Sequence, residues 1–160
     1  MLTLKEIHNL CITLNFSICV AESCTSGAVA SILTSLSGSS KYFKGGVIAY
    51  NNDIKENILG VSKTNLIDNT EVSTQVIEEM AKNVRIKFNT DFSIATSGYL
   101  GPTGGSIYNP KGTIFISVSS RNDIVTNKFL FKGDRKVIKK QTVHKSLELL
   151  LTEIKKVNKL

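Results

Sequence analysis

SICVAESCTSGAVASILTSL, residues 17–36, sets the pattern for the rest of the chain. Residues 17–21 form a short apolar run typical of a buried strand, and residues 28–36 have the apolar spacing of a helix. Gly38 follows as a helix stop, and small residues dominate the turn at 22–27. A buried strand followed at once by a helix is the repeating unit of a parallel sheet, so this segment predicts an α/β fold.

The flanking sequence continues the alternation of helices and strands and then changes to a hairpin. Gly60 is expected to end a helix for which Asp53 is the predicted N-cap. A late hairpin adds antiparallel strands, so the predicted fold is a single-domain α/β/α sandwich with a mixed sheet over residues 1–160. Besides the helix at 28–36, the expected helices cover 3–15, 53–59, 73–88 and 135–157. Besides the strand at 17–21, the expected strands cover 47–50, 92–96, 113–119 and 124–131.

Composition excludes several classes of protein. The sequence has 160 residues, of which 41% are hydrophobic and 21% charged, which argues against disorder. No apolar run approaches the roughly 18 residues of a transmembrane helix. Glu6, His8 and Asn9 precede or interrupt the apolar N-terminal segment, so we expect folded structure there rather than a signal peptide.

Cysteine usage indicates a reducing compartment. The three cysteines are an odd number in a chain large enough to fold without disulfides. No Cys/His pair has the spacing of metal ligands, so no metal site is expected. We therefore expect a cytoplasmic protein.

The excess positive charge lies in one C-terminal element. Residues 1–127 carry ten basic and ten acidic side chains, whereas residues 128–160 carry ten basic and three acidic ones, a net charge of +7. A basic stripe can bind nucleic acid or anionic lipid. The favoured interpretation is a solvated helix face, which is the usual fate of a charge run.

The turn at 21–27 is the first candidate for chemistry. Ser23 stands where a nucleophile would be exposed at the carboxyl end of a strand, and the following helix amides would face an anion or an oxyanion. The alternative is a plain N-cap. Cys24 is a rival nucleophile, although no basic residue nearby in the sequence would make it a thiolate.

Three further segments carry candidate polar groups. Tyr50 ends a predicted strand and Lys55 lies one turn into the next helix, so both side chains can serve a serine that lacks a histidine base, or can be ordinary surface groups. The glycine-rich stretch 97–106 can present amides to a phosphate or can be a crossover loop. Arg135 can bind a phosphate or carboxylate, while Asp134 can simply cap the last helix.

In combination these segments resemble the CinA carboxy-terminal domain family, the nicotinamide-nucleotide amidohydrolases. The matching pieces occur in the order of the family and cover nearly the whole chain. They are AESCTSG at 21–27, GSSKYFKGGVIAYNNDIKENILGV at 38–61, VS at 72–73, SGYLGPTGGS at 97–106, GT at 112–113 and GDR at 133–135. The amino-terminal domain of longer members is not matched, so the resemblance implies a stand-alone form.

The resemblance implies hydrolysis of the carboxamide of nicotinamide mononucleotide (NMN) to nicotinate mononucleotide and ammonia, in pyridine nucleotide salvage, without metal or cofactor. Ser23 becomes the nucleophile, and Tyr50 and Lys55 become its activating partners, with the identity of the base left open. The resemblance also implies a homo-oligomer, with no membrane or nucleic-acid partner. The implied substrate-binding residues are Thr25, Gly45, Ser97, Gly98, Gly101, Gly104, Gly105, Arg135 and Lys139.

The sequence departs from the family pattern around the presumed pocket. Ser26 replaces a glycine, Tyr99-Leu100 replaces Ile-Ala, Thr70-Glu71 replaces Gly-Ala, Asn109 begins a changed Lys-Pro-Val-Gly-Thr run, and Lys139 replaces an arginine. Lysine lacks the bidentate fork with which arginine binds phosphate. Two alternatives to the deamidase follow: a divergent member that binds a nucleotide or another amide without deamidating NMN, and a nucleic-acid-binding module that uses residues 128–160.

Overall fold

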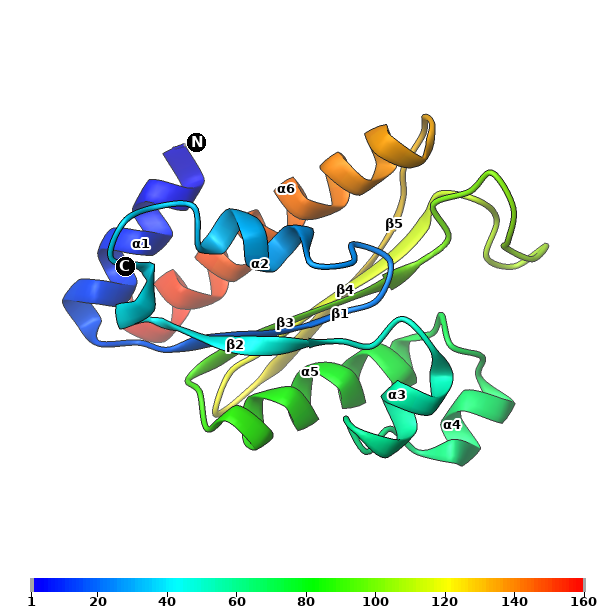
Figure 1. Ribbon diagram of the computed structural model, residues 1–160, viewed down its shortest axis with the longest axis horizontal. Helices are drawn as coiled ribbons and strands as arrows, with labels where there is room; N and C mark the ends of the chain where they lie inside the picture. Colours follow the sequence, from blue (N-terminus) through cyan, green and yellow to red (C-terminus); the bar gives the residue numbers. More distant parts are fainter. Residues whose placement is uncertain (1, 160) are drawn as a thin grey trace.

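The computed structural model describes residues 2–159 and contains one five-stranded sheet covered by helices on both faces (Figure 1). The helices are α1 (Leu2–Leu14), α2 (Ala28–Leu33), α3 (Asn52–Asn57), α4 (Lys63–Asp68), α5 (Thr74–Phe88) and α6 (Arg135–Asn158), with a short 3-10 turn at Ser39–Lys41. The strands are β1 (Ile18–Glu22), β2 (Phe43–Ile48), β3 (Phe92–Gly98), β4 (Thr113–Ser119) and β5 (Ile124–Leu130).

The sheet is mixed, as predicted. Its strand order is β2-β1-β3-β4-β5. The strands β2, β1 and β3 are parallel, and β4 and β5 join the sheet antiparallel. The α/β/α fold class is therefore confirmed. Because β1, β2 and β3 run in the same direction, the segments that follow them emerge at the same edge of the sheet.

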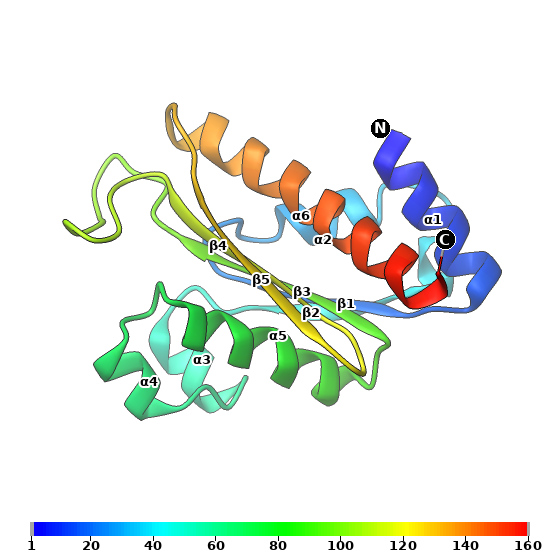
Figure 2. The ribbon, with the colours of Figure 1, turned by 180° about the vertical axis from the view of Figure 1, so that it is seen from behind.

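The two faces of the sheet carry different helices. Helices α1, α2 and α6 cover one face, and α3, α4 and α5 lie on the other (Figures 1 and 2). The chain therefore leaves β1 toward one face, into α2, and leaves β2 toward the opposite face, into α3. Adjacent parallel strands whose connections diverge in this way open a crevice at their carboxyl ends.

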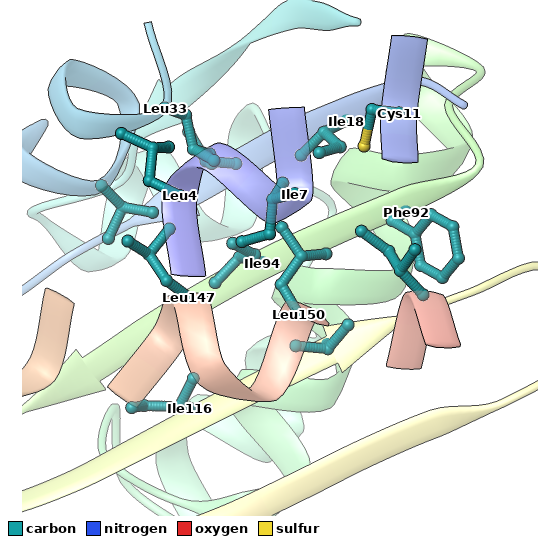
Figure 3. Close-up of a cluster of buried hydrophobic side chains, with 14 of the residues drawn as sticks. Leu4, Ile7, Cys11, Ile18, Leu33, Phe92, Ile94, Ile116, Leu147 and Leu150 are labelled. Carbon is teal, nitrogen blue, oxygen red and sulfur yellow. The ribbon is translucent and has the colours of Figure 1, made fainter. Parts of the chain in front are cut away.

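Two apolar clusters hold the helices to the sheet. On the α6 face, Ile7 and Leu150 pack with Ile94 and Ile116, all of them fully buried (Figure 3). On the α5 face, the apolar side of α5 packs over β1 and β3, as the spacing of Val76, Ile77, Met80, Ala81 and Val84 predicts.

Strand β2 is longer than the sequence predicts and starts at Phe43 instead of residue 47. Gly45 and Gly46, which precede the expected strand, lie inside the observed one. A Cβ on Gly46 would lie 2.5 Å from the Val20 carbonyl oxygen, so the missing side chain lets β2 pass close to β1. The strand also ends at Ile48, which leaves Tyr50 in the loop beyond it.

The helix expected at 53–59 is also displaced. It is α3, and Asn51 caps it by accepting the Asp53 amide at 2.8 Å, so the predicted cap at Asp53 is wrong. The apolar spacing at 28–36 overestimates α2, which ends at Leu33. Helix α4 was not predicted, because it buries no side chain and so has no apolar periodicity.

The basic residues of α6 are partly neutralised by neighbours. Lys145 pairs with Glu148 on α6, Lys156 pairs with Asp123, and Lys155 pairs with Glu6 on α1. Among residues 2–159, no helix is long and apolar enough to cross a membrane.

The carboxylate of Glu22, the last residue of β1, is completely buried and caps α2. It accepts the backbone amides of Gly27 at 2.9 Å, Val29 at 3.1 Å and Ala30 at 2.7 Å. One side chain thereby ties the end of the strand to the start of the helix, and the turn that carries Ser23 is held between them.

We expect Glu22→Gln to lower the free energy of unfolding by about 2–3 kcal/mol, because a carboxamide keeps one acceptor oxygen and turns an NH₂ group toward amide donors. Urea unfolding followed by circular dichroism measures the change. The control is Glu78→Gln on α5, which should stay within about 0.5 kcal/mol of wild type. Equal stability of the two variants would contradict the capping role.

Candidate active site

A cavity of about 430 Å³ opens at the carboxyl edge of the parallel strands. Ser23 and Cys24 reach it from the end of β1, Tyr50 to Lys55 from the segment after β2, and Ser97 to Gly101 from the end of β3. Glu71 enters from the approach to α5, and Arg135 from the first residue of α6. The volume is within the range of small-molecule sites.

The backbone of the strands fixes Ser23 in this cavity. Its amide donates to the Thr96 carbonyl of β3 at 2.9 Å, and its side chain is nearly buried, with 8% exposed. Two residues on, the hydroxyls of Thr25 and Thr96 share a 2.6 Å hydrogen bond inside the protein. The serine therefore sits on a turn that is anchored to the neighbouring strand.

The amides at the start of α2 do not form the anion site that the sequence suggests. Those of Gly27, Val29 and Ala30 already bind Glu22. Within residues 2–159, no backbone hydrogen bond joins the amide of Cys24 or Thr25 to another residue, although the Cys24 amide interacts with its own thiol. The donors left for a ligand next to Ser23 are therefore those of the turn and not those of the helix.

Lys55 is a buried amine on the wall of the cavity. Its side chain is 1% exposed, and Nζ donates to Asn52 Oδ1 at 3.1 Å. Burial lowers the pKa of Lys55, while the negative charge of Glu71 opposes the shift. A lysine in such a place is more readily neutral, and a neutral amine can accept a proton.

Arg135 joins two sides of the cavity mouth. Its Nη2 donates to the Tyr50 hydroxyl oxygen at 2.8 Å, and its Nη1 donates to the Gly101 carbonyl at 3.0 Å. Tyr50, although 57% exposed, is thereby held near the glycine-rich loop. Because the Tyr50 oxygen accepts this bond, the hydrogen of the Tyr50 hydroxyl is left to donate to another group.

Hydrogen bonds from the β3 loop hold Glu71 and the residue after it. Ser97 Oγ donates to the Glu71 carbonyl at 3.0 Å, and Asn109 Nδ2 donates to the Val72 carbonyl at 3.2 Å. The Tyr99 hydroxyl donates to Glu71 Oε1 at 3.2 Å. Burial, followed by the adjacent carboxylate, raises the pKa of Tyr99, so its hydroxyl stays protonated.

Seven of the twelve residues singled out from the sequence line this cavity: Ser23, Tyr50, Lys55, Ser97, Gly98, Gly101 and Arg135. The other five lie outside it. Thr25 is buried against Thr96, and Gly45 lies within β2, where a Cβ would be 3.1 Å from the Phe88 ring. Lys139 donates to Ser26 Oγ at 2.6 Å and borders a separate groove beside α2.

Gly104 and Gly105 pack closely against residues of the loop that forms one wall of the cavity. A Cβ at Gly104 would lie 3.2 Å from the Tyr99 ring, and one at Gly105 would lie 2.9 Å from the Lys111 amide. These glycines allow the loop to fold closely on itself at positive φ. The structure gives them a packing role, where the resemblance implies substrate binding.

Sequence reasoning missed Glu71, Asn51 and Asn52 as cavity residues. Glu71 appeared only as a departure from the family pattern, and the two asparagines only within the matching piece at 38–61. The signal for Glu71 was its position just before a helix that follows a parallel strand, because such a helix begins at the same sheet edge.

Cys24 also lines the cavity but is a poor nucleophile. Burial raises its pKa to about 12, so the thiolate is scarce at neutral pH. In the described part of the chain, residues 2–159, no group of three or more His, Cys, Asp or Glu side chains is placed to hold a metal ion.

The sequence model of the CinA C-terminal domain matches residues 3–154. This chain belongs to the CinA C-terminal domain family. A CinA-like protein of Flavobacterium psychrophilum is 41% identical over 140 residues, and one of Prochlorococcus marinus is 45% identical over 130 residues. These alignments cover 88% and 81% of this CinA domain but only 34% and 31% of the two relatives.

Solved structures of the family have the same fold as this CinA domain. A CinA superfamily protein from Enterobacter cloacae superimposes with a TM-score of 0.91 at 33% identity, covering 95% of this chain and 90% of that one. A CinA superfamily protein from Escherichia coli has a TM-score of 0.90 at 30% identity, covering 93% and 87%.

We expect Lys55→Met to stabilise the protein at pH 7, because it removes an amine whose protonated form is disfavoured by burial. The folded-state pKa of Lys55 lies below the unfolded value of 10.5, so the unfolded chain binds more protons between the two values and wild-type stability rises with pH there. The gain from Lys55→Met should therefore be full below the folded-state pKa and shrink as pH approaches 10.5.

Urea unfolding at a series of pH values, with wild type measured beside the variant, tests this. Lys63→Met, at an exposed position, is the matched control and should change stability by less than about 0.5 kcal/mol at every pH. A loss of stability in Lys55→Met, or a gain that does not depend on pH, would show that burial of the Lys55 ammonium does not destabilise the protein.

Proposed function

We propose that this protein hydrolyses the carboxamide of NMN to nicotinate mononucleotide and ammonia, with Ser23 as the nucleophile. The observation that carries the proposal is the meeting of three groups in one cavity: the Ser23 hydroxyl, the buried Lys55 amine of lowered pKa, and the Tyr50 hydroxyl held by Arg135. A serine hydroxyl needs a base to attack an amide, and a desolvated lysine is one of the groups that can serve.

In the first half of the reaction, Ser23 Oγ attacks the amide carbon and the neutral Lys55 amine takes its proton. Lys55 is favoured over Tyr50 as the base, because burial lowers its pKa whereas Arg135 occupies the Tyr50 oxygen as an acceptor. We assign the oxyanion that forms to the amides of Cys24 and Thr25, which lie on the turn beside Ser23 and donate to no other backbone group in the described residues.

Collapse of the tetrahedral intermediate breaks the C–N bond. The departing nitrogen takes the proton held by the Lys55 ammonium, directly or by way of the Tyr50 hydroxyl, and leaves as ammonia, which returns the amine to its neutral form. The acyl group remains as an ester on Ser23. Water then attacks this ester while the amine accepts one of its protons. The ammonium returns that proton to Ser23 Oγ as the ester bond breaks, and nicotinate mononucleotide leaves.

Arg135 is suited to the phosphate of the nucleotide. The guanidinium has five N–H donors. The bonds to Tyr50 and Gly101 come from its two Nη atoms, one bond from each. Its exposure at the mouth of the cavity leaves donors for a phosphate at the end of the substrate that is remote from Ser23. A missing positive charge there weakens binding more than turnover.

A second candidate is a nucleotide-binding protein that does not deamidate NMN. The Tyr99 side chain, a departure from the family pattern, supports it by occupying the cavity wall beside Ser97. This candidate predicts a thermal shift with NMN and no release of ammonia.

Purified wild-type protein should release ammonia from NMN, and Ser23→Ala should lower kcat by at least about a thousandfold, because the acyl step loses its nucleophile. Cys24→Ala is the matched control at the neighbouring cavity position and should keep most of the activity. A coupled ammonia assay measures the rates, and circular dichroism establishes that each variant is folded.

Loss of activity in Cys24→Ala with retention in Ser23→Ala would reverse the assignment of the nucleophile. Absence of ammonia release from the wild type, with a thermal shift on addition of NMN, would favour the second candidate.

A further inference from the structure

The charged groups of the cavity are divided between the two faces of the sheet. Helices α5 and α6 lie on opposite faces of the sheet (Figure 1). Glu71 comes shortly before α5, Arg135 is the first residue of α6, and Ser23 follows β1, a strand of the sheet. A ligand that extends across the strand ends therefore meets a carboxylate on one side and a guanidinium on the other.

The carboxylate of Glu71 is not matched by an ion pair in the described part of the chain. Among residues 2–159, no lysine, arginine or histidine nitrogen lies within 4.0 Å of it. The positive charge of Lys55 interacts with Glu71, but the hydrogen bond of Lys55 Nζ goes to Asn52. Within the described residues, Glu71 therefore brings a carboxylate into the cavity that forms no ion pair, although its charge acts on the Lys55 amine.

An aromatic ring stands beside this charge. Tyr99 lines the same cavity and binds Glu71 Oε1 through its hydroxyl. The ring is half-buried and backed by Gly104, and the backbone of Glu71 is fixed by Ser97. Ring and carboxylate are thus preorganised in one place, and both attract a cation: the ring through its quadrupole and the carboxylate through its charge.

We propose that Glu71 and Tyr99 form a subsite for a flat organic cation, which in NMN is the pyridinium ring. The inference rests on the proposed function for the identity of the ligand. It adds a reason for specificity: the ring that bears the reacting carboxamide is recognised by its positive charge, on the α5 side, while Arg135 receives the phosphate on the α6 side. A neutral ring of the same shape loses both attractions.

The reduced form of NMN tests this directly. It carries the same carboxamide, ribose and phosphate, but its dihydropyridine ring is uncharged. We expect Ser23→Ala protein, which binds without turnover, to bind NMN about tenfold more tightly than reduced NMN by calorimetry, a preference typical of a cation beside a carboxylate and a ring.

Glu71→Gln in the Ser23→Ala background should remove about fivefold of that preference by weakening NMN, with little change for reduced NMN. Tyr99→Leu should reduce the preference in the same direction. The control is Glu78→Gln, which removes the same charge from α5 outside the cavity and should leave the ratio unchanged. A role of Glu71 in folding alone would weaken both ligands equally and leave the ratio intact.

The outcomes separate this inference from the proposed function. Equal affinities for the two forms, or an unchanged ratio in Glu71→Gln, overturn the cation subsite even if wild-type protein releases ammonia. A charge preference that Glu71→Gln abolishes, in a protein whose wild type releases no ammonia, supports the subsite and refutes the deamidase.

Discussion

The buried carboxylate of Glu22 connects the sheet to the chemistry that we assign to its edge. It is the last residue of β1, and it accepts three amides at the start of α2. The chain between these two points has little freedom, and Ser23 lies within it with its own amide bonded to β3. A buried charge needs such partners to be tolerated in a protein interior. The same interaction uses the helix amides, so it leaves the turn amides as the donors beside Ser23.

The cavity also has features that work against stability. Lys55 is buried with a lowered pKa, and Glu71 has no ion-pair partner in the described chain. Apolar side chains at these positions would fold at lower cost, and sites that keep such groups are commonly functional ones. In our account the lowered pKa of the amine suits it to proton transfer, and the carboxylate, which accepts only the Tyr99 hydroxyl, is kept for a cationic ring. Arg135 and Tyr50 lie at the exposed mouth of the cavity, so they destabilise the folded state less.

The fold was largely predictable, because its signals are local. The apolar run before Ser23, the spacing along α5 and the late hairpin each depend on neighbours in the sequence, and together they imply a mixed sheet covered on both faces. Gly45 and Gly46 misled the prediction, since their role is a close approach to Val20 that only the paired strands create. The short helix α4 gave no signal because none of its side chains is fully buried, and only Leu66 packs against the core.

The candidate site was predictable only in part. The ends of parallel strands meet at one edge, so Ser23, Tyr50 and Ser97 could be grouped from order alone, and the resemblance added their expected roles. Glu71 was not placed with them, because grouping it requires that the start of α5 be assigned to the same edge of the sheet. Lys139 was expected at the substrate, yet it bonds to Ser26 beside another groove.

A crystal structure of Ser23→Ala protein with NMN bound tests the account most directly. We predict that the carboxamide carbon lies about 3–3.5 Å from the position of the missing Ser23 hydroxyl oxygen, the distance of a near-attack arrangement. The pyridinium ring should lie against Tyr99 and Glu71, and the phosphate against Arg135. A nucleotide bound outside this cavity, or one with its carboxamide turned away from residue 23, would contradict the account.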